Sequence, residues 1–435
     1  MVTAGTLGAI LLFAASFAAN GVVLAYRWAR TPYVRTIVDG WARRLTGRGG
    51  WSWLKLWHIL AAAAAVAAVN LVWSVPGNQC SLDSLALYAS GSAALHGHDP
   101  FLVNACGFPN PDPIPYGGAA VLLDSLGALA GSVLGVWIVW QFIALGVILL
   151  VWNLGGTDRR YLSVLTLTSV LFLPNFATRI DGPENTVVGI SVLLMLCSLR
   201  STGWRGKAWG SLAAFLSTAR FSAFPPTLAA TLTPKGGSRS IAVLAVGVFV
   251  ATAGVCYEIW GWVALKVVYL DQFTRVPAQS FNAFDLLLRQ GWVHPSLALA
   301  AIQGGALVAL MVVTTLRGYS PLGAACLVLV GVMLTTQYAL LHFDAWLIPL
   351  VLLGPRVNRA LLVYGGLWYL DANIAIGYLG ATRGVWWPTE LLGVVLAAIL
   401  AYLVIRIILD EESMRQRSPF AGAGAGPEGG AVARR

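Results

Sequence analysis

The sequence predicts an all-α protein whose helices form a polytopic transmembrane bundle. Of its 435 residues, 58% are hydrophobic and 11% are charged, and the mean hydropathy is +0.74. Soluble domains carry about 25% charged residues, so most of this chain is suited to lipid rather than to water. Apolar runs of roughly 20 residues recur along the chain, and each is long enough to cross a bilayer as a helix. The basic residues lie mainly in short connections between these runs, where they set topology.

About 11 to 12 segments are expected to cross the membrane wholly or in part. The first has no basic n-region and no evident cleavage site, so we expect a retained helix rather than a signal peptide. The segments lie near 4–26, 55–75, 135–154, 161–177, 184–199, 208–233, 241–265, 295–316, 320–338, 343–354, 360–379 and 387–409. Those at 161–177, 184–199 and 343–354 are short.

The positive-inside rule gives one consistent topology if the segment 208–233 enters and leaves the membrane on the same side. Arg220 and Pro225-Pro226 interrupt this segment. Two half-helices in a re-entrant hairpin would explain the interruption, because broken helices are tolerated at membrane depth where they line a cavity. A single kinked span is the alternative.

The chain divides into three parts. Residues 1–54 form an extra N-terminal helix and a basic cytoplasmic loop, in which a surface helix would hold Trp41, Trp51 and Trp53 at the headgroup level. Residues 55–409 form the transmembrane domain, with helical outer loops, and hold the candidate catalytic residues considered below. Its first outside loop, 76–134, includes an expected helix at 82–96 and an apolar stretch at 118–133 that is suited to the interface. Residues 410–435 form a Gly/Ala-rich cytoplasmic tail, predicted to be disordered.

Cysteine usage is sparse. Cys197, Cys256 and Cys326 lie inside predicted spans and are interpreted as small core residues. Cys80 and Cys106 share the first outside loop, on the oxidising side of the membrane, and form either a disulfide that brackets Asp83 or two free thiols. The chain has no zinc-ligand spacing of Cys and His, and no nucleotide-binding or serine-hydrolase motif. The net charge of +10 is spread over short loops, so we expect no nucleic-acid partner.

Asp83 is the principal candidate for chemistry. It follows a hydrophobic span and precedes Tyr88, His98 and Asp99. A carboxylate at the membrane boundary could deprotonate a hydroxyl acceptor, and nearby apolar helices would raise its basicity. Alternatively, Asp83 caps the helix at 82–96. Asp99 is the nearest rival for the role of base.

Four cations could hold a phosphate: Arg220 within a span, His342 at the outer end of a helix, and Arg179 and Arg275 in outer loops. The alternatives are structural, since Arg220 could pair with Glu184 or Glu258 and His342 could cap a helix. The cluster of Asp181, Glu184 and Asn185 could bind a sugar or a cation, or form a solvated turn.

These motifs lie in an order that resembles the GT-C-fold glycosyltransferases that use polyprenyl-phosphate-sugar donors. The similarity is greatest to the branch of actinobacterial α-mannosyltransferases and arabinofuranosyltransferases, and it covers about residues 55–380. That branch has an acid before a tyrosine, then a small-residue helix, Gly-x-Asp-Pro-Tyr and Tyr-Pro-Pro. The counterparts here are Asp83, Tyr88, Ser90 to Phe101, and Pro115-Tyr116-Gly117. Later counterparts are Gly182-Pro-Glu-Asn185, Gly210 to Arg220 with arginine for the usual lysine, Gln279-Ser-Phe-Asn282, and Tyr338 to Pro349 around His342.

The resemblance implies a bundle of GT-C type in which Asp83 is the general base toward the acceptor hydroxyl. It implies His342 and Arg220 as contacts to the donor phosphate, with Arg275 as a weaker candidate. Contacts to the acceptor or sugar are expected from Tyr88, His98, Asp99, Tyr116, Glu184 and Asn185. Transfer would invert the anomeric centre, and the leaving phosphate needs neutralisation by cations rather than protonation. No cofactor or metal is required, because the lipid-linked sugar is the co-substrate.

We therefore expect a multi-pass enzyme of the bacterial plasma membrane with an extracytoplasmic active site. It would move a sugar, with mannose preferred, from a polyprenyl-phosphate donor to a glycolipid or cell-envelope glycan, with membrane lipids as its surroundings. The alternatives are arabinofuranosyl transfer, a transporter or lipid flippase, and a non-catalytic scaffold for envelope assembly. A transporter would show inverted repeats and charges near mid-bilayer, and beyond Arg220 and Glu258 the sequence shows neither clearly.

Overall fold

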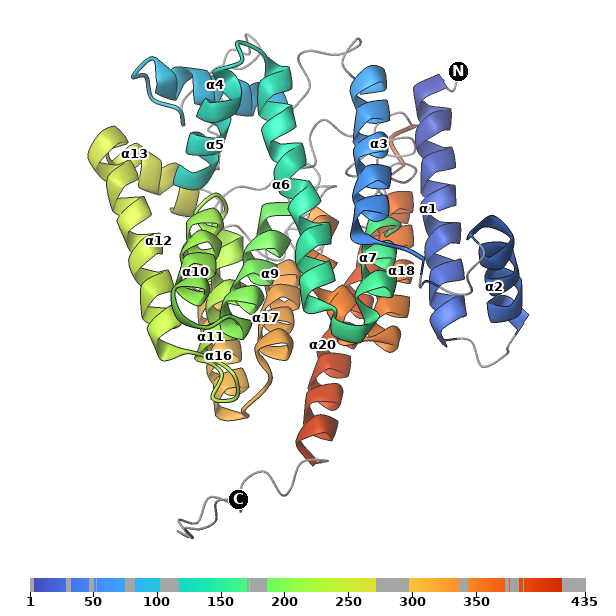
Figure 1. Ribbon diagram of the computed structural model, residues 1–435. Coiled ribbons are helices and arrows are strands. Elements are labelled where there is room, and N and C mark those ends of the chain that lie inside the picture. The colour runs from blue at the N-terminus through green and yellow to red at the C-terminus, as the bar shows by residue number, and fades with distance from the viewer. Residues whose placement is uncertain are drawn as a thin grey trace, which may run out of the picture.

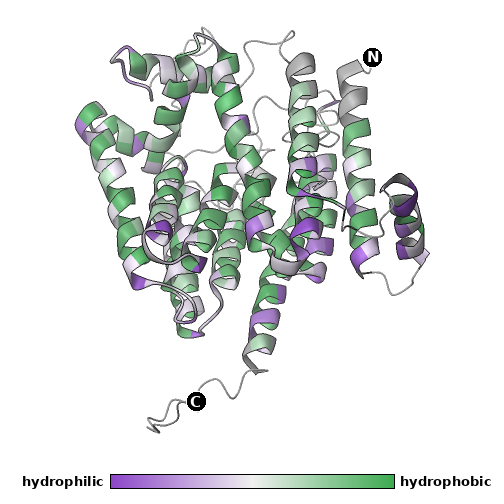
Figure 2. Cartoon of the chain, viewed as in Figure 1, coloured by the Kyte–Doolittle hydropathy of each residue, from purple (hydrophilic) through white to green (hydrophobic). Residues whose placement is uncertain are grey.

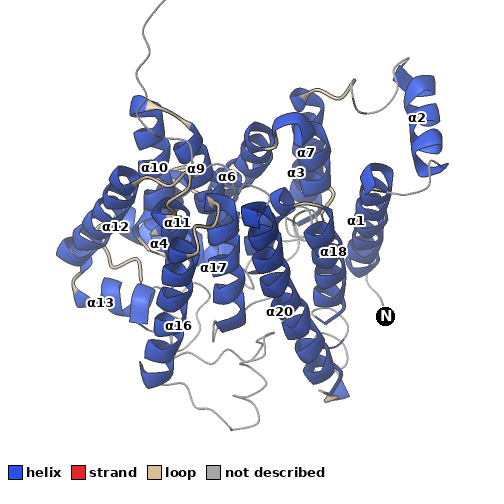
Figure 3. Ribbon diagram, turned by 90° about the horizontal axis from the view of Figure 1, so that it is seen from below, coloured by secondary structure: helices blue, strands red, loops and turns tan. Residues whose placement is uncertain are grey.

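A computed structural model gives the fold of the chain. It describes residues 4–28, 33–46, 51, 53–74, 83–101, 117–169, 172, 186–270, 297–335, 343–371, 375, 383–385 and 387–416, and for some of these, Asp83 among them, only the course of the backbone. All regular secondary structure in this part of the chain is helical (Figure 3), which confirms the predicted all-α class.

Figure 1 shows the helices as a bundle of upright rods. The N-terminal half contains α1 (Ala4–Trp28), α2 (Tyr33–Thr46), α3 (Leu56–Ser74), α4 (Asp83–Leu95), α5 (Gly118–Ala128), α6 (Val133–Leu154), η1 (Gly156–Asp158), α7 (Arg159–Leu167), α9 (Thr186–Arg200) and α10 (Gly203–Ser217). The C-terminal half contains η3 (Phe221–Ala223), α11 (Phe224–Leu232), α12 (Arg239–Trp260), α13 (Trp262–Leu265), η4 (Lys266–Leu270), α16 (Leu297–Leu316), α17 (Pro321–Thr335), η5 (Phe343–Leu353), α18 (Pro355–Leu370) and α20 (Trp387–Gln416).

Three described helices are long and apolar enough to cross a membrane: α6, α12, and α20 over Trp387–Met414. Several shorter apolar helices pack beside them, α9 and α17 among them. Figure 2 shows mainly hydrophobic helix walls, with hydrophilic positions on α2 and around the lower helix ends. The chain is therefore a membrane protein.

The core is built around two helices that are apolar on every side. In α9 every residue from Thr186 to Ser198 is buried, and in α17 every residue from Gly323 to Met333 is buried. A helix that is hydrophobic all round belongs inside a bundle rather than at its edge. The largest buried side chains, Trp140, Trp346 and Tyr364, fill the space between helices.

Arginine side chains satisfy the carbonyl groups at several helix ends. Arg200 donates to the carbonyl of Leu154 at 2.7 Å, where α6 ends. Arg35 of α2 donates to the carbonyls of Tyr26 at 3.0 Å and of Arg27 at 3.2 Å, in the last turn of α1. Because the last carbonyls of a helix lack partners within it and carry partial negative charge, these cations stabilise the ends they contact.

Two short predicted spans take forms that hydropathy did not specify. In the run at 161–177, α7 ends at Leu167, and at that end Ser16 of α1 donates to the carbonyl of Thr168 at 2.6 Å and Asn20 donates to its hydroxyl at 2.9 Å. The run at 343–354 is an 11-residue 3-10 helix that contains Pro349. At about 2.0 Å per residue it spans about 22 Å, further than an α-helix of equal length.

Candidate functional site

A break in the chain between α10 and α11 forms the centre of the candidate site. The structure has two short helices on either side of residues 218–223, which confirms the predicted interruption of the segment 208–233. Pro225 and Pro226 lie in the first turn of α11, where a missing N–H costs nothing. Arg220 itself is extended, with φ −146° and ψ 119°.

Arg220 is a buried cation. It is only 2% exposed, and its Cζ lies 5.4 Å from the ring centroid of Trp346. The face of an indole carries negative potential, so this ring stabilises the guanidinium in low-dielectric surroundings. Trp346 is the fourth residue of η5, which begins directly after His342. Glu258, one of the two carboxylates expected to pair with Arg220, is exposed on α12, and no described ion pair joins them.

The chain at the start of α5 packs directly on this break. The N–H of Gly117 donates to the carbonyl of Ala219 at 3.0 Å, and the N–H of Ala119 donates to the hydroxyl of Thr218 at 3.2 Å. A Cβ on Gly117 would lie 1.9 Å from the carbonyl oxygen of Thr218, so only glycine permits this approach. The start of α5 is therefore held beside Arg220.

Aromatic rings line the other side of the break. Phe221 and Phe224 both contact Phe249 of α12, at centroid distances of 6.3 and 4.0 Å. Tyr269 of η4 lies 5.7 Å from both Phe221 and Phe249. Burial raises the pKa of Tyr269, so its phenol stays neutral. These four residues, here called the aromatic cluster, give the site an apolar wall next to its cation.

A glycine contact and a buried acid position α4, the helix that opens with Asp83. A Cβ on Gly91 of α4 would lie 2.3 Å from the carbonyl carbon of Asp124, so the backbones of α4 and α5 touch at this point. Asp124 is fully buried, and its Oδ1 accepts a hydrogen bond from Trp140 of α6 at 2.8 Å. Helices α4, α5 and α6 therefore form one packed unit.

The predicted residues in this first loop differ in their surroundings. Helix α4 spans Asp83–Leu95, close to the predicted 82–96. Tyr88 is half-buried against the core, and His98 is exposed. Asp99 accepts the N–H of Phe101 at 2.8 Å, which closes a tight turn. Asp99, the other candidate for the general base in this loop, therefore has a structural role in the turn.

Several predicted residues lie outside the described part of the chain. They are Cys80, Cys106, Tyr116, Arg179, Asp181, Glu184, Asn185, Arg275 and His342. Cys197, Cys256 and Cys326 are free and buried, as expected for core residues. Among the described residues no three His, Cys, Asp or Glu side chains gather as a metal site would require.

Sequence reasoning missed four residues of the site: Trp346, Asp124, Phe249 and Tyr269. The acid of Asp124 in an otherwise apolar stretch was a usable signal, because a charge there needs a buried partner. The other three are aromatic residues in or beside apolar runs, and only the fold shows that they face Arg220 and Phe221.

Comparison of the chain with protein-family profiles, with curated proteins and with solved structures gives no match.

Proposed function

We propose that the protein is a membrane glycosyltransferase that uses a polyprenyl-phosphate-linked sugar, with mannose as the expected sugar. The acceptor would be a glycolipid or cell-envelope glycan, and transfer would take place at the extracytoplasmic face. The observation that carries the proposal is the buried Arg220, stacked on Trp346 at a helix break that also holds the start of α5. A guanidinium that stacks on an indole ring at a helix break is suited to contact a phosphate group.

The site combines features that suit the two parts of such a donor. A guanidinium can neutralise a phosphodiester, and His342 would add a second donor from the segment that leads into η5. Phe221 follows Arg220 in the chain and belongs to the aromatic cluster. This cluster would offer an apolar surface to an isoprenoid tail. A soluble nucleotide sugar would have no use for such a wall.

The proposed reaction is a single displacement. The Asp83 carboxylate takes the proton of the acceptor hydroxyl while that oxygen forms a bond to the anomeric carbon of the sugar. The bond between that carbon and the phosphate oxygen breaks, and its electron pair stays on the phosphate. Arg220 and His342 stabilise the added charge, so the leaving group needs no proton. The anomeric configuration inverts, and Asp83 later returns its proton to water.

The experiment uses the full-length protein in lipid nanodiscs with polyprenyl-phosphate donors that carry radiolabelled mannose or arabinofuranose. Extracted envelope glycolipids serve as acceptors. We expect labelled product and free polyprenyl phosphate in equal amounts with one of the two donors. Failure of both donors with every acceptor, or movement of intact lipid between leaflets without sugar transfer, would overturn the proposal.

Three variants assign the roles. Asp83→Asn should abolish transfer while donor binding persists, whereas Asp99→Asn should retain transfer because Asp99 serves a turn. Arg220→Ala should lower kcat/KM by roughly 10- to 100-fold, the usual effect of losing one charge-assisted hydrogen bond. Arg205→Ala is the matched control, since Arg205 is an exposed arginine of the neighbouring helix α10. Full activity of Asp83→Asn would remove that residue from the role of base.

A further inference from the structure

Helix α2 lies outside the bundle, beside the lower end of α1, as Figures 1 and 3 both show. Its sequence, YVRTIVDGWARRLT, gathers apolar residues on one side and most polar residues on the other, and Arg44 extends the apolar side at its C-terminal end. Tyr33, Ile37 and Trp41 follow one another at four-residue intervals, so each lies about 40° further round the helix than the last. They form a continuous stripe along α2, which we call the apolar stripe.

The apolar stripe points away from the protein. Tyr33 is 71% exposed, Trp41 64% and Ile37 42%. A water-soluble protein would turn such a stripe toward its core and leave the charged side outside. Here the apolar stripe is exposed together with the arginines of α2, so an apolar medium beside that side would stabilise the helix.

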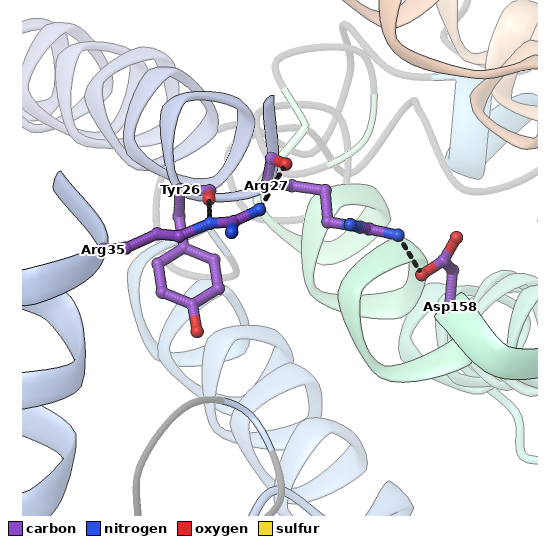
Figure 4. A network of polar contacts seen from close by, with 4 residues as sticks. All are labelled: Tyr26, Arg27, Arg35 and Asp158. Carbon is purple, nitrogen blue, oxygen red and sulfur yellow. Dashed lines mark hydrogen bonds and ion pairs between the residues drawn. The ribbon is translucent and has the colours of Figure 1, made fainter. Parts of the chain in front are cut away.

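Polar contacts fix this orientation. Arg35 lies about 200° round the helix from Tyr33, and it donates to the last-turn carbonyls of α1, Tyr26 at 3.0 Å and Arg27 at 3.2 Å (Figure 4). Asp39, on the same side as Arg35, accepts the hydroxyl of Tyr26 at 2.8 Å. Arg27 continues the network to Asp158 at 3.0 Å. The polar side of α2 is therefore attached to the bundle, and the apolar stripe cannot turn inward.

Charge identifies the occupant of this surface. Helix α2 carries three arginines and one acid, and Arg43 and Arg44 are both exposed at its C-terminal end. Each basic residue near a membrane surface gains about 1 kcal/mol from anionic lipids. A protein partner would need an apolar groove and acidic residues together, whereas an anionic leaflet supplies both chemistries beside a protein already in the membrane.

We propose that α2 is an anionic-lipid-binding helix that inserts its apolar stripe below the headgroups and places Arg43 and Arg44 among them. The helix lies in the plane of the interface, as amphipathic helices with basic residues do. This inference does not depend on the proposed enzymatic activity.

Hydrogen exchange of the full-length protein in nanodiscs tests the proposal. Discs of phosphatidylcholine alone are compared with discs that contain phosphatidylglycerol as well. We expect amides of residues 34–46 to exchange about tenfold or more slowly in the anionic discs, from two arginines near the surface. High salt should remove that difference, since it screens exposed charges. Peptides from α12 report on global folding throughout.

Two double variants separate the electrostatic contribution to this protection from the hydrophobic one. Arg43→Ala/Arg44→Ala should remove the effect of phosphatidylglycerol and leave the basal protection in phosphatidylcholine, while Arg205→Ala should change neither. Tyr33→Ser/Trp41→Ser should lose protection in both kinds of disc. Equal exchange in both kinds of disc would overturn the proposal. So would protection that rises with the number of copies per disc, because it would assign the stripe to a second copy of the chain.

Discussion

The indole N–H of Trp140 donates to the Oδ1 of Asp124 at 2.8 Å, and this bond joins α5 to α6 inside the protein. The Oδ2 of Asp124 has no hydrogen-bond partner among the described residues. Burial raises the pKa of Asp124 well above its usual value of 3.8, and the bond from Trp140 offsets this only in part. Burial therefore favours the protonated form of Asp124 in the folded protein.

Stability should consequently fall as the pH rises above about 4, because the unfolded chain ionises Asp124 while the folded chain keeps its proton. Asp124→Asn should abolish this slope, since an amide of the same shape keeps an acceptor for Trp140 and cannot ionise. Thermal unfolding midpoints from about pH 5 to pH 8 measure the effect. Trp140→Phe should cost about 1–3 kcal/mol by stranding a buried acceptor. An Asn variant with the slope of the wild type would show that Asp124 ionises in both states.

Gly91→Ala should separate α4 from α5. The new Cβ would lie 2.4 Å from the carbonyl oxygen of Asp124, and overpacking of this kind costs about 1–3 kcal/mol. Gly146→Ala in α6 is a matched control, because no heavy atom lies within 4 Å of its Cβ. That variant should be neutral or gain up to about 1 kcal/mol from helix propensity. Equal unfolding midpoints for the two variants would contradict the close contact.

Trp346→Leu should weaken donor binding by removing the ring beneath Arg220. A cation–π contact of about 0.5–2 kcal/mol corresponds to a roughly 2- to 30-fold rise in donor KM. Trp346→Phe should retain most of the affinity. Trp368→Leu creates a comparable cavity elsewhere in the core, since Trp368 is 2% exposed and packs on Tyr364. Donor titrations of the three variants, at matched expression, distinguish a local effect from general destabilisation.

The adjacent acids Glu411 and Glu412 of α20 should differ in their importance for stability. Glu411 is buried and accepts the N–H of Ser320 at 2.8 Å, at the start of α17. Glu412 pairs with Arg317 at 2.9 Å, but these side chains are 32% and 57% exposed. Glu411→Ala should cost about 1–3 kcal/mol, and Glu412→Ala less than about 1 kcal/mol. Similar unfolding midpoints for the two variants would contradict this ranking.

Local sequence patterns predicted much of the fold. Hydrophobic periodicity predicted the all-helical class, the helix at Asp83–Leu95 and a surface helix between 27 and 53. The prolines predicted the break around Arg220. The end of α7 could not be predicted in the same way. There, carbonyls of α7 and of Thr168 accept hydrogen bonds from Ser16 and Asn20 of a helix far away in the chain, and hydropathy carries no information about such partners.

The candidate site was predictable in part for the same reason. A charged residue inside an apolar run is easily recognised, so Arg220 was identified from the sequence alone. Its ring partner was not, because Trp346 is one of 18 tryptophans and nothing local distinguishes it. Trp51 and Trp53, expected at the headgroup level, lie after the end of α2 and are half-buried against the core.

The backbone bond between Gly117 and Ala219 limits how this protein can be recombined with others. A chimera that takes residues 76–134 from another protein would place a different residue next to Thr218. Any side chain at position 117 would clash with the carbonyl oxygen of Thr218. The loop and the segment 203–232 thus constitute one exchangeable module, and swaps intended to alter specificity should transplant both pieces together.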